Sequence, residues 1–121
     1  MELKTKTTGA ILLTEELSEF LIKKAGKLEV FLKDDPAAIV EIEVGTTSNG
    51  QRTGDVYRGE VHVTFAGGDA YAEAVADTLH KAADQAFAEV RRELRKMKSK
   101  HRDMVRRGAG KVKDFFRNFG K

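Results

Sequence analysis

A helical stripe of apolar residues runs through the last third of this 121-residue chain. Its members step by four, three, four, four and three residues: Leu79, Ala83, Ala86, Val90, Leu94 and Met97. This spacing follows the 3.6-residue period of an α-helix, and Phe87 widens the stripe. The pattern predicts one long helix over 78–105, ended by Gly108 and Gly110. A helix with one apolar side needs an apolar surface to cover.

Alternating residues upstream predict that this surface is a β-sheet. Segments 38–45 and 56–65 place apolar and polar side chains on opposite faces, as a half-buried strand requires. The expected inward residues are Val40, Ile42, Val44, Val61, Val63 and Phe65. The fourth strand is expected over 70–76, after a tight connection at Gly67 and Gly68. Residues 2–7 alternate as well and predict a short first strand.

Another helix is expected between the first two strands. Thr14 is a suitable N-cap, and the acidic residues Glu15 and Glu16 follow it, where the helix dipole favours negative charge. Apolar residues then recur at helical spacing as far as Leu32, so we predict one helix over 15–32. Pro36 ends it, because the residue before a proline is disfavoured in the helical region.

The resulting order is β-α-β-β-β-α, which predicts an α+β fold. We expect a four-stranded sheet with both helices packed on one face, an arrangement like that of a double-stranded-RNA-binding domain. The domain is expected over 1–105, followed by a basic, Phe-rich C-terminal tail over 106–121. In that tail the spacing of four apolar residues is compatible with a short amphipathic helix: Val112, Phe115, Phe116 and Phe119.

The charge of the chain is unevenly distributed. The formal net charge is +3, but residues 1–90 carry 9 Lys/Arg and 16 Asp/Glu, and residues 91–121 carry 13 and 3. A body of net charge −7 is thus followed by a segment of +10. This asymmetry favours a polyanionic partner, either nucleic acid or an anionic membrane surface, over a small-molecule substrate.

Basic residues at the end of the second helix are the strongest candidates for binding that partner. They leave the apolar stripe free and have few acidic neighbours, and lysine and arginine gain affinity for phosphates by releasing counterions. A smaller group lies on the first helix, with Lys23 beside it, and could complete a basic groove. The candidate RNA-binding residues are Lys24, Lys27, Arg91, Arg92, Arg95, Lys96, Lys98, Lys100 and Arg102.

Nothing in the sequence indicates an enzyme, a metal or a cofactor. There is no cysteine, and no nucleophile lies beside a base. His62 is at an outward strand position, and His80 and His101 are too far apart on one helix to share a metal. Outward glutamates on the predicted strands, such as Glu41 and Glu60, favour an acidic back to the sheet. Without an apolar membrane-spanning run or a signal sequence, we expect a cytoplasmic protein that is a monomer when free.

Three segments together resemble the family of ribosome hibernation-promoting factors, also called ribosome-associated inhibitors. They are LTEELSEFLIKKAGKLEVFL (13–32), YRGEVHVTFAGGDAYAEAVA (57–76) and TLHKAADQAFAEVRRELRKMKSK (78–100). The chain is similar to the short form of that family, over about residues 1–100. It departs from the family in the segment Thr78-Leu79-His80, where Asp-Met/Leu-Tyr is usual: Thr78 and His80 replace the usual Asp and Tyr.

The resemblance implies binding to rRNA of the small ribosomal subunit, in the channel used by mRNA and the anticodon ends of tRNA. Such a protein blocks translation and protects idle ribosomes without catalysing a reaction. Two alternatives remain open from the residues themselves. One is a general module for structured RNA. The other is a peripheral membrane or assembly protein that acts through its amphipathic tail.

Overall fold

The sheet has four strands, arranged in space in the order in which they occur in the chain. The first two strands run parallel, and the remaining neighbours are antiparallel. The elements are β1 (Glu2–Thr7), α1 (Glu15–Gly26), α2 (Glu29–Leu32), β2 (Ile39–Thr46), β3 (Tyr57–Phe65), β4 (Gly68–Ala76) and α3 (Leu79–Arg107). The computed structural model describes residues 1–47 and 56–107, with side chains as far as Ser99.

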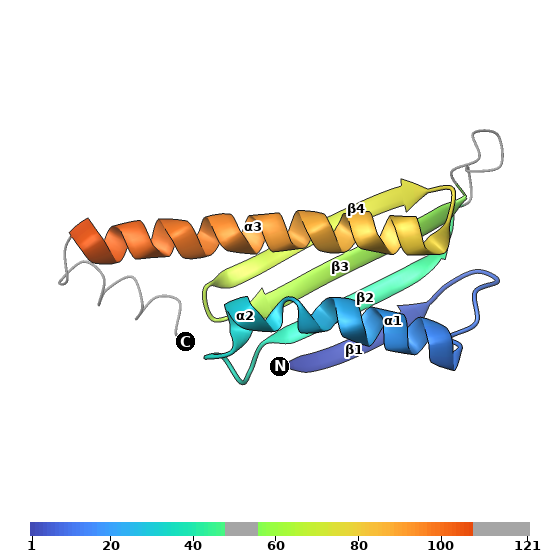
Figure 1. Cartoon of the computed structure of the whole chain (residues 1–121), viewed down its shortest axis with the longest axis horizontal. Helices are drawn as coiled ribbons and strands as arrows, with labels where there is room; N and C mark the ends of the chain where they lie inside the picture. Colours follow the sequence, from blue (N-terminus) through green and yellow to red (C-terminus); the bar gives the residue numbers. More distant parts are fainter. Residues whose placement is uncertain (48–55, 108–121) are drawn as a thin grey trace.

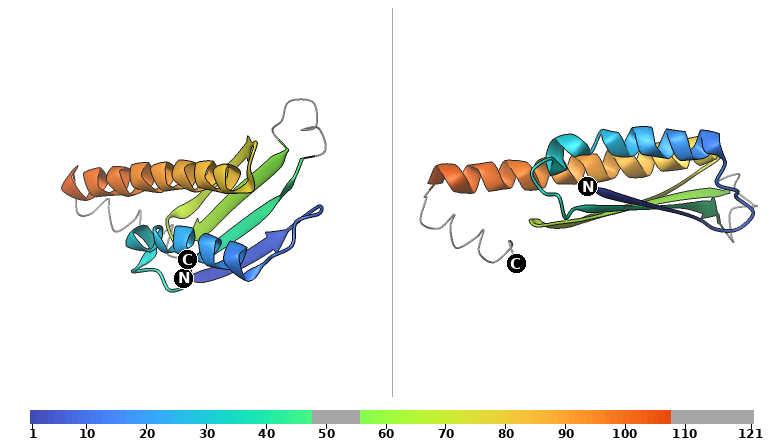
Figure 2. Two further views of the ribbon diagram at one scale, coloured as in Figure 1. Left: turned by 45° about the vertical axis from the view of Figure 1, so that its right-hand side comes forward. Right: turned by 90° about the horizontal axis from the view of Figure 1, so that it is seen from below.

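All helices lie on one face of the sheet, as Figure 1 and the right-hand view of Figure 2 show. The α1–α2 segment lies over the β1–β2 side, whereas α3 lies over β3 and β4. The expected α+β fold is therefore confirmed, including the packing of both helical segments, side by side, on a single face. The expected tail over 106–121 lies outside the described residues except for the end of α3, so its boundary and amphipathic character stay predictions.

The core confirms the periodicity of both the strands and the last helix. The inward valines of β2 and β3 are buried, as are Ala83, Ala86, Val90 and Leu94 along α3. Phe87 is also buried, and Met97 packs against the edge of the same cluster. Leu21 and Leu28 fill the core from the other helical segment. Each such large side chain stabilises the fold by about 1.5–3 kcal/mol relative to an exposed position.

Close contact between α3 and the sheet depends on small residues from both sides. Ala82 and Ala83 face the sheet, and β4 contributes Ala70 and Ala72 to the core. At Gly59 of β3, a Cβ atom would lie only 2.9 Å from the backbone of Ala82 and Ala83. The helix backbone thus passes directly over a position that cannot hold a side chain without displacing it.

The predicted single helix over 15–32 is wrong in one respect, because the structure divides it into α1 and α2. Its start is as expected, with the Leu17 amide donating to Thr14 Oγ1 at 3.1 Å. After Gly26, however, the amide of Leu28 bonds to the carbonyl of Ala25 at 2.9 Å. This three-residue spacing tightens the chain into a 3₁₀-like turn, and glycine supports the break through its low helix propensity.

Asp35 fixes the turn after α2 and links it to the hairpin between β3 and β4. One of its carboxylate oxygens accepts from the Ala37 amide at 3.2 Å, and the other from the Ala66 amide at 2.6 Å. The predicted tight connection is present, since Gly68 has φ +132, a conformation that L side chains rarely adopt. Two turns that are distant in the sequence are joined at one end of the sheet.

The close approach at Gly59 predicts a stability difference between two glycines. Gly59→Ala should destabilise the protein by about 1–3 kcal/mol, because the added methyl group must push α3 away from β3. Gly26→Ala is the matched control, since a Cβ there meets nothing within 4 Å. It should cost nothing and can add up to about 1 kcal/mol. Urea denaturation of both variants measures this, and equal stabilities would contradict the packing argument.

Candidate RNA-binding surface

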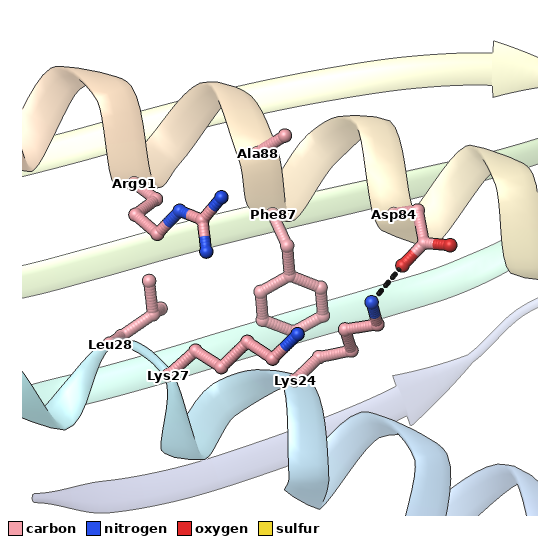
Figure 3. Close-up of a pocket in the computed structure, with 7 residues that line it drawn as sticks. All are labelled: Lys24, Lys27, Leu28, Asp84, Phe87, Ala88 and Arg91. Atoms are coloured by element: carbon pink, nitrogen blue, oxygen red, sulfur yellow. Dashed lines mark ion pairs between the residues drawn. The ribbon is translucent and has the colours of Figure 1, made fainter.

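A groove separates α1 from α3 on the helical face of the protein. Its volume is about 230 Å³, and Figure 3 shows side chains from both helices reaching into it. Basic and acidic groups lie at its sides, and apolar groups form its floor. The lining residues are Lys24, Lys27, Leu28, Asp84, Phe87, Ala88 and Arg91. The structure thus brings three of the predicted binding residues together.

The side chain of Lys24 forms an intramolecular ion pair. Its ammonium group lies 2.5 Å from Oδ1 of Asp84 on α3, and that oxygen is shielded from solvent. The same ammonium lies 5.7 Å from the centroid of the Phe20 ring, at cation–π distance. Because a carboxylate already neutralises it, Lys24 contributes less to the attraction of an external anion than its position suggests.

Lys27 and Arg91 supply the accessible positive charge of the groove. Lys27 is exposed at the end of α1, and Arg91 is half-buried on α3. Among the described residues, neither forms an ion pair. In Figure 3 the Arg91 guanidinium extends from α3 toward the α1 side. Two cations on opposite sides of a groove are suited to a phosphate, and arginine can bind one through two parallel hydrogen bonds.

The basic end of α3 continues beyond the sheet, past the hairpin of β3 and β4 (Figure 1). Arg95 and Lys96 precede the contact of Met97 with this hairpin and are exposed, and no ion pair to them occurs within the described part of the chain. Arg92 is exposed too but pairs with Glu89 at 2.5 Å. Lys98 lies 5.7 Å from the centroid of the Phe65 ring.

Two further predicted residues, Lys100 and Arg102, belong to α3, but their side chains lie outside the described residues. Their positions on the helix continue the basic segment along the part of α3 that extends past the sheet. The predicted set is therefore divided among the groove, the exposed helix surface and the helix end.

The open face of the sheet is acidic and is organised around Arg58. This guanidinium lies 3.3 Å from Glu73 and 4.0 Å from Glu43, and it also pairs with Glu60. Burial acts to lower the pKa of Arg58, but the hydrogen bond and charge of Glu73 and the charges of Glu60 and Glu43 outweigh it and raise the pKa. One cation therefore holds three carboxylates from three strands together.

Arg58 was not predicted from the sequence, although a signal was present. Arg58 and Glu60 are two residues apart in an alternating strand and so share a face. The cross-strand register, which brings Glu73 opposite Glu60, becomes visible only in the folded sheet. On the same face, burial and the charges of Glu60 and Glu73 raise the pKa of the Tyr71 hydroxyl.

The histidines have separate structural surroundings. His62 lies on the open face, with Nε2 at 3.0 Å from Asp69. His80 packs on Phe20 of α1, with ring centroids 4.3 Å apart, and Thr78 caps α3 by accepting from the Lys81 amide at 3.1 Å. Within residues 1–47 and 56–107, no cluster of His, Cys, Asp or Glu could hold a metal ion.

Comparison with known protein families gives a match over most of the domain. Residues 6–102 match the model of the family described as Sigma 54 modulation protein / S30EA ribosomal protein. The chain belongs to this family. Its members are ribosome-associated modulation proteins, so the resemblance to hibernation-promoting factors found from the sequence is confirmed. The family is one of ribosome-binding modulation factors and is not known for enzymatic activity, and association with ribosomes implies a cytosolic location.

Solved structures share the fold. The N-terminal domain of Protein Y from Thermus thermophilus matches with a TM-score of 0.66 and 17% identity, covering 79% of this chain and 98% of that one. A ribosomal subunit interface protein from Coxiella burnetii matches with a TM-score of 0.67 and 17% identity, covering 82% of this chain and 99% of that one.

A search of curated proteins gives no match. No helix within the described residues is long and apolar enough to span a membrane.

The different environments of the three groove cations predict different contributions to polyanion binding. Lys27→Gln and Arg91→Gln should each lower the salt concentration that elutes the protein from a heparin column. Lys24→Gln should lower it less, because the Lys24 ammonium is held against Asp84 and is not free to contact the polyanion directly. Heparin chromatography in a salt gradient compares the three. A larger effect at Lys24 than at Lys27 would contradict this ranking.

Proposed function

We propose that the helical face of this protein binds rRNA of the small ribosomal subunit. The observation that supports it is the opposite charge of the two faces. Lys27, Arg91, Arg95 and Lys96 lie on the helical side, whereas the open side of the sheet carries the carboxylates around Arg58. A polyanion is attracted to one face and repelled by the other, so charge alone orients the protein on RNA.

The bound protein occupies the channel through which mRNA and the anticodon ends of tRNA pass. It thereby blocks translation and protects idle ribosomes. Family membership supports this function, and the helical face provides the chemistry: basic side chains for phosphates and a groove for the backbone, with no need for contacts to base edges. The extended end of α3, which includes Lys98, Lys100 and Arg102, contacts the RNA backbone farther from the sheet.

A pair of charge reversals on each face tests the orientation. Arg95→Glu with Lys96→Glu should weaken binding of the full-length protein to purified small subunits about tenfold or more. It should also reduce the slope of log affinity against log salt by about two, because two phosphate contacts are lost. Co-sedimentation at several salt concentrations measures both quantities.

The matched control is Lys4→Glu with Lys6→Glu, which changes the net charge equally on exposed positions of β1. Lys4 lies opposite Glu41 and Lys6 opposite Glu43, so both belong to the open face. This variant should bind within about twofold of the wild type. Equal losses in the two variants would indicate attraction by net charge alone, without a preferred face.

Competition tests the location on the subunit. Small subunits preloaded with mRNA and a tRNA should bind the protein much more weakly than empty ones, because all three need the same channel. Sedimentation of the labelled protein with both kinds of subunit gives the measurement. Equal binding would place the site elsewhere. Comparable affinity for an arbitrary RNA duplex would support the alternative of a general RNA-binding module.

A further inference from the structure

Asp84 is an acidic residue in a groove that otherwise attracts anions. Its carboxylate lies on α3 between the two helices, and its side chain is 47% exposed. Oδ1 is buried against the Lys24 ammonium, whereas Figure 3 shows the second oxygen turned away from Lys24. The ion pair fixes the orientation of the carboxylate and leaves Oδ2 available to an external hydrogen-bond donor.

The chemistry of RNA determines what such an acceptor can bind. Phosphate oxygens only accept hydrogen bonds, so they are repelled by a carboxylate. The 2′-hydroxyl of ribose is a donor that repeats along the backbone, and DNA lacks it. A hydrogen bond to a charged acceptor is stronger than one between neutral groups. An acidic side chain beside phosphate-binding cations is therefore suited to a ribose.

The dimensions and lining of the groove fit a sugar–phosphate segment. Asp84 and Arg91 are two turns apart on α3, about 10 Å along the helix axis, which leaves space for a phosphate and a neighbouring sugar. Between them, the buried side chains of Phe87 and of Leu28 in the α1–α2 turn form an apolar floor, and the exposed Ala88 lies beside it. Such a floor can pack against the carbon atoms of a ribose ring while polar groups bind at each end.

We propose that Asp84 makes the groove selective for RNA, with Oδ2 accepting a hydrogen bond from a ribose 2′-hydroxyl. Lys27 and Arg91 bind the adjacent phosphate. Lys24 is a positioning residue: it holds the carboxylate in place and offsets its charge, so that the backbone can approach. This assignment rests on the proposed RNA-binding function and adds to it a means of distinguishing ribose from deoxyribose.

The test compares two hairpins of identical sequence, one of RNA and one in which fluorine replaces each 2′-hydroxyl. The fluorinated hairpin retains its phosphates and A-form shape but donates no hydrogen bond from the sugar. Fluorescence anisotropy with the full-length protein should show about tenfold tighter binding to RNA. In Asp84→Ala, this preference should fall about fivefold or more, while the affinity for the fluorinated hairpin rises because Lys24 is released.

Glu89→Ala is the matched control. It also removes a carboxylate from α3 and releases a paired cation, Arg92, but Glu89 does not line the groove. It should increase the affinity for both hairpins and leave the preference for RNA unchanged. Equal binding of the two hairpins by the wild type, or an unchanged preference in Asp84→Ala, would overturn the assignment.

A second variant covers the case in which Asp84→Ala does not fold, and a second assay separates the role of Asp84 from the proposed function. If thermal melting shows that Asp84→Ala does not fold, Asp84→Asn replaces it. Asparagine keeps an acceptor oxygen without the charge, so the preference should fall about threefold, and no change would again overturn the assignment. Co-sedimentation of the wild type with small subunits separates the two proposals. Failure to bind subunits rejects the proposed function, whereas binding to subunits without sugar preference rejects only the role of Asp84.

Discussion

The contact between α3 and the β3–β4 half of the sheet is the interaction on which the other features depend. The helix lies close because both surfaces are made of small residues, and at Gly59 its backbone occupies the space of a missing side chain. Glycine weakens a strand on its own, so this position is explained by the packing that it permits. With the helix fixed in rotation, its buried stripe is fixed, and so is the direction of every basic residue on its outer side.

The same sheet separates the two kinds of charge. Its helical face is covered by apolar packing, so the ionised groups of the strands lie on the opposite face, where Arg58 offsets part of their mutual repulsion. Arg58 is partly shielded from solvent, so its loss would leave the carboxylates around it without a compensating positive charge. On the helical side, Lys24 and Asp84 use an ion pair differently, to join α1 to α3.

Local patterns were sufficient to predict most of the fold. The alternation around Val40 and Val61 and the stripe that includes Val90 and Leu94 each follow from one repeating geometry, and the structure buries all four residues. The break after Gly26 was missed because the apolar spacing continues through it, so the pattern is the same for one helix or two. The parallel pairing of β1 with β2 was not predicted either, since it depends on where the intervening helix packs.

Features of the candidate site that involve two elements were the hardest to predict. The sequence identifies Lys24 as basic but does not show that Asp84, 60 positions later, neutralises it. Arg58 was missed for the same reason, because its carboxylate partners come partly from other strands. Single-element features, such as the exposure of Arg95 and Lys96, could be predicted because they require only that one helix has an apolar side.

The end of the sheet where α3 leaves it has a mechanical consequence. Asp35 ties the turn after α2 to the β3–β4 hairpin, and Met97 and Lys98 rest on that hairpin through Gly68 and Phe65. The helix is therefore held by the sheet along one part of its length, and the hairpin is its last contact with the sheet among the described side chains. A force on the part of α3 beyond the hairpin is transmitted to the sheet at this point, where Asp35 connects the N-terminal half of the chain to the hairpin.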